Sequence, residues 1–100
     1  MKMEERRKLT EDELKKGLED LPDWDLLDGK LHKQFKFRSF AEAIGWMTMA
    51  AIYADKIDHH PEWSNVYNRV TVDLITHDLY AVSTLDLLLA RQMELLHQGM

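Results

Sequence analysis

The stretch "FAEAIGWMTMAAIYADKIDHHP", residues 40–61, decides the fold because it predicts one long helix with a defined end. Ser39 and Glu42 form a capping box at its start, and apolar residues follow at helical spacing up to about Asp58. A helix of about 20 residues would be about 30 Å long. Pro61 cannot continue the helix, and His60 before it is pushed towards extended geometry. The expected core-facing stripe consists of Phe40, Ile44, Met47, Ala51 and Ala54.

The segment before this helix predicts a short helix followed by a hairpin. Thr10 and Glu13 form a capping box for a helix over residues 11–20, which Pro22 ends. The stretch "WDLLDGKLHKQFKF", residues 24–37, contains Asp28-Gly29, a strong signal for a tight hairpin turn. Apolar residues follow the turn at even spacing, with one lysine among them: Leu31, Lys33, Phe35 and Phe37.

The segment after the long helix predicts a second hairpin and a last helix. "EWSNVYNRVTVDLITH", residues 62–77, is rich in β-branched and aromatic residues, which indicates two short strands with Asn68 at or near the bend. Ser83 and Asp86 form a capping box for a helix that runs towards His97. The order is α-β-β-α-β-β-α. Hairpins joined by a helix predict an antiparallel sheet with the helices packed on one face.

The last helix is apolar around much of its circumference. Leu87, Leu88 and Leu89 together span about 200°, which exceeds one core-facing stripe. A helix that is apolar on two sides needs a second surface to cover it, so we expect an oligomer. The alternative is an unusually hydrophobic helix in a monomer.

Composition favours a single globular domain. The 100 residues are 45% hydrophobic and 31% charged, so we expect one domain over residues 10–100 behind a flexible tail over residues 1–9. The start shows no apolar run of a signal peptide, and the chain has no cysteine, which fits a cytoplasmic protein. The net charge of −5 argues against direct nucleic-acid binding, because such proteins carry a concentrated basic face.

Paired histidines at the end of the long helix are the first candidates for chemistry. His59 and His60 titrate near neutrality and could transfer protons, although adjacent side chains diverge and cannot easily share one role. Asp55 precedes His59 by four residues and could orient its ring. The alternative reading is a pair of histidines that cap the helix.

A third histidine, His77, follows the final strand, and strand ends commonly carry function. In a hairpin-helix-hairpin fold, the three imidazoles could border one cleft. Trp63 and Tyr67 could form the floor of a flat aromatic pocket, or could pack in the core or an interface. No metal site is expected, because the chain lacks H-E-x-x-H and cysteines, and the rings of adjacent histidines diverge.

These segments resemble the pterin-4a-carbinolamine dehydratase family over about residues 10–97. The matching motifs are "DHHPEWSNVYNRV", then "THD", then "STLDLLLA", with "DWDL" and "FKFRSFAEAIGWM" upstream. The resemblance implies an α+β fold, in which a four-stranded antiparallel sheet carries three helices. It also implies a dimer that pairs through the sheet edge, and a tetramer formed when dimers pair through helices.

The resemblance implies dehydration of 4a-hydroxytetrahydropterin to quinonoid dihydropterin and water, without metal or organic cofactor. This reaction recycles the pterin of aromatic amino acid hydroxylases. A hydroxyl leaving C4a needs a proton donor, and the nitrogen proton needs an acceptor, which are roles suited to histidine. The expected catalytic residues are His59 and His77, with His60 sharing the work and holding the substrate. The expected substrate contacts are Asp58, Pro61, Trp63, Thr76 and Asp78, with Asp55 and Asp86 in support.

Two positions depart from the family pattern. Asp55 stands where a glutamate is common, so its reach towards a histidine is one methylene shorter, and Ala81 stands where glycine is usual. The resemblance also carries an alternative function. Animal members of the family act as coactivators by binding a transcription factor's dimerisation domain through a helical surface, so the last helix could meet a protein partner.

Overall fold

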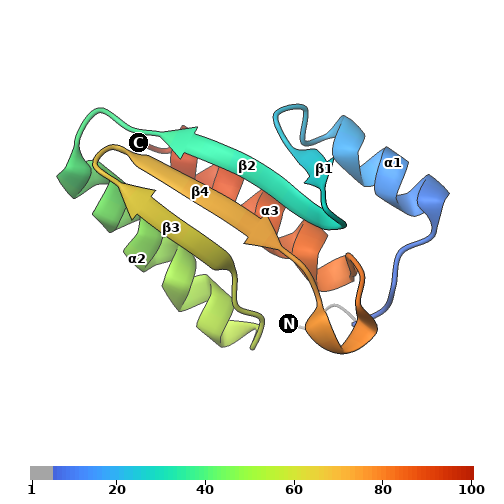
Figure 1. Cartoon of the computed structure of the whole chain (residues 1–100). Coiled ribbons are helices and arrows are strands. Elements are labelled where there is room, and N and C mark those ends of the chain that lie inside the picture. Colours follow the sequence, from blue (N-terminus) through green and yellow to red (C-terminus); the bar gives the residue numbers. More distant parts are fainter. Residues whose placement is uncertain (1–5) are drawn as a thin grey trace.

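Over residues 6–100, which the computed structural model describes, the chain folds in the predicted order α-β-β-α-β-β-α (Figure 1). A four-stranded antiparallel sheet carries three α-helices, so the predicted α+β class is confirmed. No helix within the described range is long and apolar enough to cross a membrane. The elements are α1 (Glu11–Glu19), β1 (Asp25–Leu27), β2 (Lys30–Lys36), α2 (Phe40–Lys56), β3 (Glu62–Val66), β4 (Arg69–Leu74), the short 3₁₀ helix η1 (His77–Leu79) and α3 (Thr84–Gln98).

The sheet has the strand order β1-β2-β4-β3, with every pair antiparallel. The two hairpins join where β2 pairs with β4, and this register places Leu31 opposite Leu74 and Phe35 opposite Val70. Helices α2 and α3 lie side by side behind the sheet and cover one face, while the other face is open (Figure 1). Both hairpin turns use left-handed residues, at Asp28 with φ 52° and at Tyr67 with φ 52°.

The capping predictions are confirmed at two helix starts and corrected at the third. Full capping boxes open α1 and α3, at Thr10 and Ser83. At α2, the Ser39 side chain accepts the backbone N–H of Glu42, but the Glu42 carboxylate does not return the bond to Ser39. It accepts instead from the backbone N–H and the guanidinium of Arg38, because that cation competes for the carboxylate. The helix spans 17 residues and stops at Lys56, slightly before the expected end.

The core-facing side of α2 differs from the expected stripe. Phe40, Ile44 and Ala51 are exposed, and the buried face is rotated around the helix. The helix is apolar on both sides, so spacing alone did not identify the side that meets the sheet. Small side chains let the backbone approach the strands, and one tryptophan fills the remaining space. This buried face consists of Ala43, Trp46, Ala50 and Ala54.

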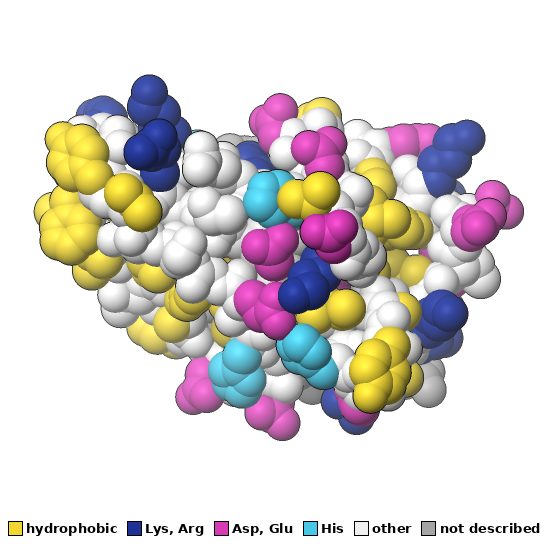
Figure 2. Space-filling view, viewed as in Figure 1, with side chains coloured by type: hydrophobic (Ala, Val, Ile, Leu, Met, Phe, Trp, Pro, Cys, Tyr) yellow, Lys and Arg dark blue, Asp and Glu magenta, His cyan; other side chains and the backbone are white. Residues whose placement is uncertain are grey.

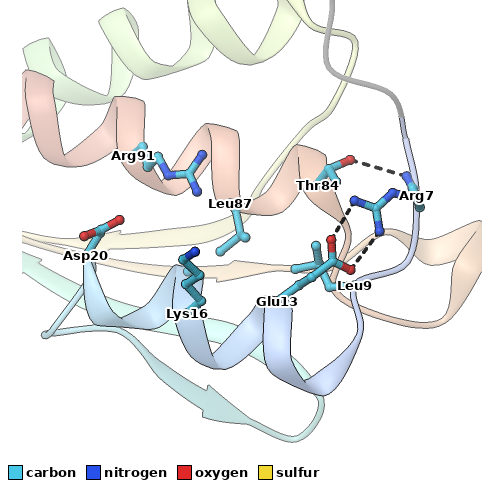
Figure 3. Close-up of a pocket in the computed structure, with 9 residues that line it drawn as sticks. Arg7, Leu9, Glu13, Lys16, Asp20, Thr84, Leu87 and Arg91 are labelled. Carbon is cyan, nitrogen blue, oxygen red and sulfur yellow. Dashed lines mark hydrogen bonds and ion pairs between the residues drawn. The ribbon is translucent and has the colours of Figure 1, made fainter.

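Two of the three consecutive leucines of α3 are buried within the same chain and Leu88 is half-buried, so the oligomer stays a prediction. Leu89 is fully buried and Leu87 is nearly so. The second surface is α1, whose Gly17 lies so close that a Cβ there would be 2.7 Å from Leu87 Cδ1. Figure 3 shows Leu87 pointing from α3 towards α1, beside a pocket of about 280 Å³ between the helices.

The segment before α1 is hydrogen bonded to the start of α3. The backbone N–H of Leu9 donates to the Val82 carbonyl, and the N–H of Thr84 donates to the Arg7 carbonyl at 3.0 Å. The Arg7 guanidinium also forms two bonds with the Glu13 carboxylate, at 2.7 and 2.8 Å (Figure 3). Part of the expected flexible tail is therefore in contact with the domain, and residues 1–5 of that tail lie outside the described range.

One buried charge lies on the core face of the sheet. Lys33, which interrupts the apolar spacing of β2, is 9% exposed. Its ammonium group pairs with Glu94 of α3 and lies 4.3 Å from the centre of the Phe35 ring. Trp24 donates its indole N–H to the same carboxylate at 2.9 Å. The lysine is tolerated there because its charge is paired and its stem lies against apolar groups.

Candidate functional site

The chain between α2 and β3 sends the two adjacent histidines in opposite directions. Asp58 adopts a left-handed conformation with φ 52°, and the His59 N–H donates to the Ala54 carbonyl at 3.0 Å. This turn ends the helix before Pro61. His59 is buried, with 8% of its surface exposed, whereas the His60 side chain is 61% exposed. The two rings therefore have different surroundings, as expected for adjacent residues.

His59 belongs to a buried hydrogen-bond network. Its Nε2 lies 2.5 Å from Asp86 Oδ1, and the other oxygen of that carboxylate accepts from the Thr76 hydroxyl at 2.8 Å. Asp86 Oδ2 also accepts the Ser83 N–H at 2.8 Å, which completes the capping box of α3. One carboxylate thus holds together the end of α2, the end of β4 and the start of α3.

His60 lines a pocket of about 540 Å³ between α2 and β3. Its Nε2 lies 3.4 Å from Asp55 Oδ1. Asp55 therefore faces His60, whereas the helical spacing had suggested that it would face His59. The reason is that the helix ends at Lys56, so the i to i+4 relation does not extend to His59. The 3.4 Å distance is long for a hydrogen bond. The full lining is Thr48, Ala51, Ile52, Ala54, Asp55, His60, Pro61 and Trp63.

Trp63 forms an apolar wall of this pocket and lies against Trp46 of the core, with ring centroids 6.3 Å apart. Tyr67, the other candidate for an aromatic floor, is 64% exposed in the β3–β4 turn and does not line the pocket. The pocket therefore combines a flat aromatic wall with one imidazole and one carboxylate, an arrangement suited to a planar ligand with polar edges.

His77 lies at the start of η1, with its side chain 72% exposed. Its Nε2 is 2.9 Å from Glu62 Oε2, and Glu62 Oε1 is 2.5 Å from Lys30 Nζ. The hydrogen bond from Lys30 lowers the pKa of Glu62, and His77 adds a smaller effect in the same direction. The same bond raises the pKa of Lys30. The carboxylate is therefore ionised at neutral pH and lies between two donors.

Acidic, basic and histidine side chains gather on the open face of the sheet, and two imidazoles lie side by side at the lower rim in Figure 2. Of the three motif histidines, His60 lines the described pocket, His59 is buried against Asp86, and His77 borders the open face with Glu62. Within residues 6–100, no three histidine or acidic side chains are arranged to hold a metal ion.

The remaining predicted residues fall into three groups. Pro61 and Trp63 line the pocket with His60. Thr76 is buried, and its hydroxyl contacts Ser83 and Asp86. The other two are exposed acids: Asp58 at the end of α2 and Asp78, which pairs with Arg6 at 2.9 Å.

Sequence reasoning missed Glu62 and Lys30. Glu62 lies inside the histidine motif and could have been noticed as the acid nearest Pro61. Lys30 could not have been noticed in this way, because it contacts Glu62 only when β2 and β3 lie on the two sides of β4.

Comparison with known proteins places the chain in a family. A family model described as pterin 4 alpha carbinolamine dehydratase matches residues 7–96. A relative from Solibacter usitatus that bears this name is 45% identical over 92 residues, covering 92% of this chain and 97% of that protein. Another, from Prochlorococcus marinus (strain MIT 9303), is 48% identical over 91 residues, covering 91% and 95%.

A solved structure agrees with these sequence relatives. The crystal structure of a protein described as a transcriptional coactivator/pterin dehydratase from Brucella melitensis has a TM-score of 0.86 and 45% sequence identity. The match covers 91% of this chain and 99% of that chain. The chain therefore belongs to the pterin-4a-carbinolamine dehydratase family.

Proposed function

We propose that this protein dehydrates 4a-hydroxytetrahydropterin to quinonoid dihydropterin and water, and so recycles the pterin of aromatic amino acid hydroxylases. The observation that carries the proposal is the pocket in which His60 and Trp63 of the family motif converge with Asp55. Its volume of about 540 Å³ suits a bicyclic ligand, and its aromatic wall suits a planar one.

The reaction moves two protons. The C4a–O bond breaks as the leaving hydroxyl takes one proton and departs as water, while the neighbouring nitrogen gives up another as the C4a=N bond forms. One group must therefore donate and another accept, and imidazoles near neutrality can do both. His60 and His77 are the accessible imidazoles of the motif, and each faces a carboxylate.

His59 is assigned a different role from the one expected from sequence. Its ring is buried and bonded to Asp86, which supports a positioning function for the turn that carries His60. Thr76 supports the same network through its bond to Asp86. Asp58 and Asp78 are proposed as substrate contacts at the rim, since both are exposed next to a motif histidine.

The test is a direct assay of the purified protein on a pterin carbinolamine generated in the cuvette. We expect quinonoid dihydropterin to form faster than the uncatalysed rate, and absence of acceleration would overturn the proposal. The assigned roles use side chains alone. Dialysis against EDTA should therefore leave the rate unchanged, and a loss restored by zinc would contradict the metal-free chemistry.

We also propose that the protein assembles with copies of itself through α2 and the edge strand β3. The exposed apolar residues supporting this lie on the outer side of α2, at the end of β3 and in the β3–β4 turn: Phe40, Ile44, Met49, Ile52, Val66 and Tyr67. Figure 2 shows hydrophobic side chains gathered at the left, over the start of α2 and this turn. β3 pairs on one side alone within the described residues, so its other edge is available to a second copy.

A protein partner is the second candidate for this surface. The Brucella melitensis relative is described as a coactivator as well as a dehydratase, and an apolar helix face of this kind suits a partner helix. The last helix, where such a partner was expected, has most of its apolar side chains buried in the chain, with Leu95 the large exposed one among those described.

A further inference from the structure

The carboxylate of Glu62 bridges two cationic or potentially cationic groups on the open face of the sheet. One oxygen is 2.9 Å from His77 Nε2, and the other is 2.5 Å from Lys30 Nζ. The three residues come from different elements, since β2 supplies Lys30, β3 supplies Glu62 and η1 supplies His77. The imidazole is mostly exposed, and the Glu62 contact is the one that fixes its Nε2 atom.

This geometry has a chemical consequence for His77. A carboxylate accepts hydrogen bonds and cannot donate them, so Nε2 must carry a proton to bond with it. The atom left for proton exchange with a ligand is then Nδ1. The negative charge of Glu62 also favours the protonated ring, and the ammonium group of Lys30 opposes that effect by neutralising the same carboxylate.

Two other acidic side chains lie near this cluster. Asp73 of β4 lies opposite Glu62 in the sheet, but its carboxylate bonds to His32 at 2.8 Å. Asp78, next to His77, pairs with Arg6. Both acids therefore have partners of their own, which leaves Glu62 as the carboxylate directly bonded to the ring.

We propose that Glu62 is a positioning residue for the dehydratase reaction, acting through His77, and that Lys30 tunes its effect. This inference rests on the proposed function, because it assumes that His77 exchanges a proton with the substrate. Glu62 holds the ring by Nε2 and presents Nδ1 to the substrate. Lys30 holds the carboxylate in place and reduces its negative field.

The experiment compares Glu62→Gln and Lys30→Met with the wild type by two measurements. The first is the pH profile of kcat, and the second is NMR titration of the His77 ring, which does not depend on activity. Glu62→Gln should lower kcat by about tenfold, a part of what acid–base catalysis contributes, with little change in KM. It should also move both the His77 titration and the matching limb of the profile to lower pH.

Lys30→Met should move the same titration and limb to higher pH, because the full charge of Glu62 then acts on the imidazole. Lys30→Arg keeps the cation and should restore wild-type behaviour. Asp73→Asn is the matched control, since it neutralises another carboxylate of the same face and should shift the titration much less than Glu62→Gln.

Two titration results would overturn the inference. One is an unchanged His77 titration in both Glu62→Gln and Lys30→Met. The other is an equal shift in Asp73→Asn, which would indicate a general field and not the bridging contact. A His77→Ala variant with full rate would refute the assumed role of His77 and the positioning role with it. Loss of rate in His77→Ala without any Glu62 effect would leave the proposed function standing and refute the inference alone.

Discussion

At the scale of single residues, each motif histidine has its own carboxylate. His59 meets Asp86, His60 meets Asp55, and His77 meets Glu62. A carboxylate beside an imidazole favours the protonated ring and fixes which nitrogen carries hydrogen. The burial of the three pairs differs: the His59 pair lies inside the fold, whereas the rings of His60 and His77 are exposed.

The buried pair predicts a large and specific stability effect. Asp86→Asn should lower the free energy of unfolding by about 3 kcal/mol, because the change weakens a buried charge-assisted network. Asp55→Asn is the matched control: its pair is exposed, so the expected change is within about 0.5 kcal/mol. Urea unfolding followed by circular dichroism measures both. Equal costs for the two variants would contradict the structural role of the His59–Asp86 pair.

At the scale of elements, helix α1 packs against the second apolar side of α3, and the close contact between the two helices depends on Gly17. Gly17→Ala adds a Cβ that would be 2.7 Å from Leu87 Cδ1, so Leu87 must move. Gly45→Ala, in the exposed part of α2, meets nothing within 4 Å. We expect Gly45→Ala to stabilise the protein by about 0.5–1 kcal/mol through helix propensity.

Gly17→Ala should lose that gain and destabilise the protein, because overpacking costs about 1–3 kcal/mol. Chemical denaturation of both variants in parallel provides the measurement. If the two alanines stabilised equally, the close contact between α1 and α3 would be wrong.

The attachment of α1 also predicts a pH dependence. The hydrogen bonds from Arg7 hold the pKa of Glu13 at about 2, compared with its usual value of 4.5. A lowered pKa in the folded state means that the unfolded state binds the proton more readily in this range. The stability from this pair is therefore present above about pH 4.5 and is lost as the pH falls towards about 2.

Glu13→Gln should flatten that part of the stability curve. Thermal unfolding between these pH values, for wild type and variant, is the measurement. Identical slopes would show that the Arg7–Glu13 pair does not contribute.

Much of the element pattern could be predicted from sequence, because capping residues, Asp28-Gly29 and Pro61 act locally. The buried face of α2 and the packing of α1 against α3 could not be predicted from sequence. Both α2 and α3 are apolar on two sides, and only packing selects which side faces the core. The same limit applies to the site. The histidine motif indicated a segment that lines a pocket, but the partners of His60 and His77 depended on where the helix ended and which strands became neighbours.

At the scale of the whole molecule, the apolar outer side of α2 is the surface that a second copy should cover. Ile44→Glu places a charge there and should shift the native mass to a smaller species while the helical signal is retained. Leu95→Glu is the control, because Leu95 is an exposed leucine of α3 outside this surface. Light scattering measures the native mass of both variants, and we expect it to fall in Ile44→Glu and not in Leu95→Glu.

A wild type that is monomeric at micromolar concentration would refute assembly. If the mass changed in Leu95→Glu and not in Ile44→Glu, the interface would lie on α3 instead of α2.

The most direct test of the central claim, that pocket-facing His60 carries acid–base chemistry, is the kcat of His60→Ala on the pterin carbinolamine. The variant should lose about 10²–10⁴-fold in kcat, which is the usual contribution of such catalysis, and its circular dichroism should match the wild type. A His60→Ala protein that is folded and turns over at the wild-type rate would contradict the account.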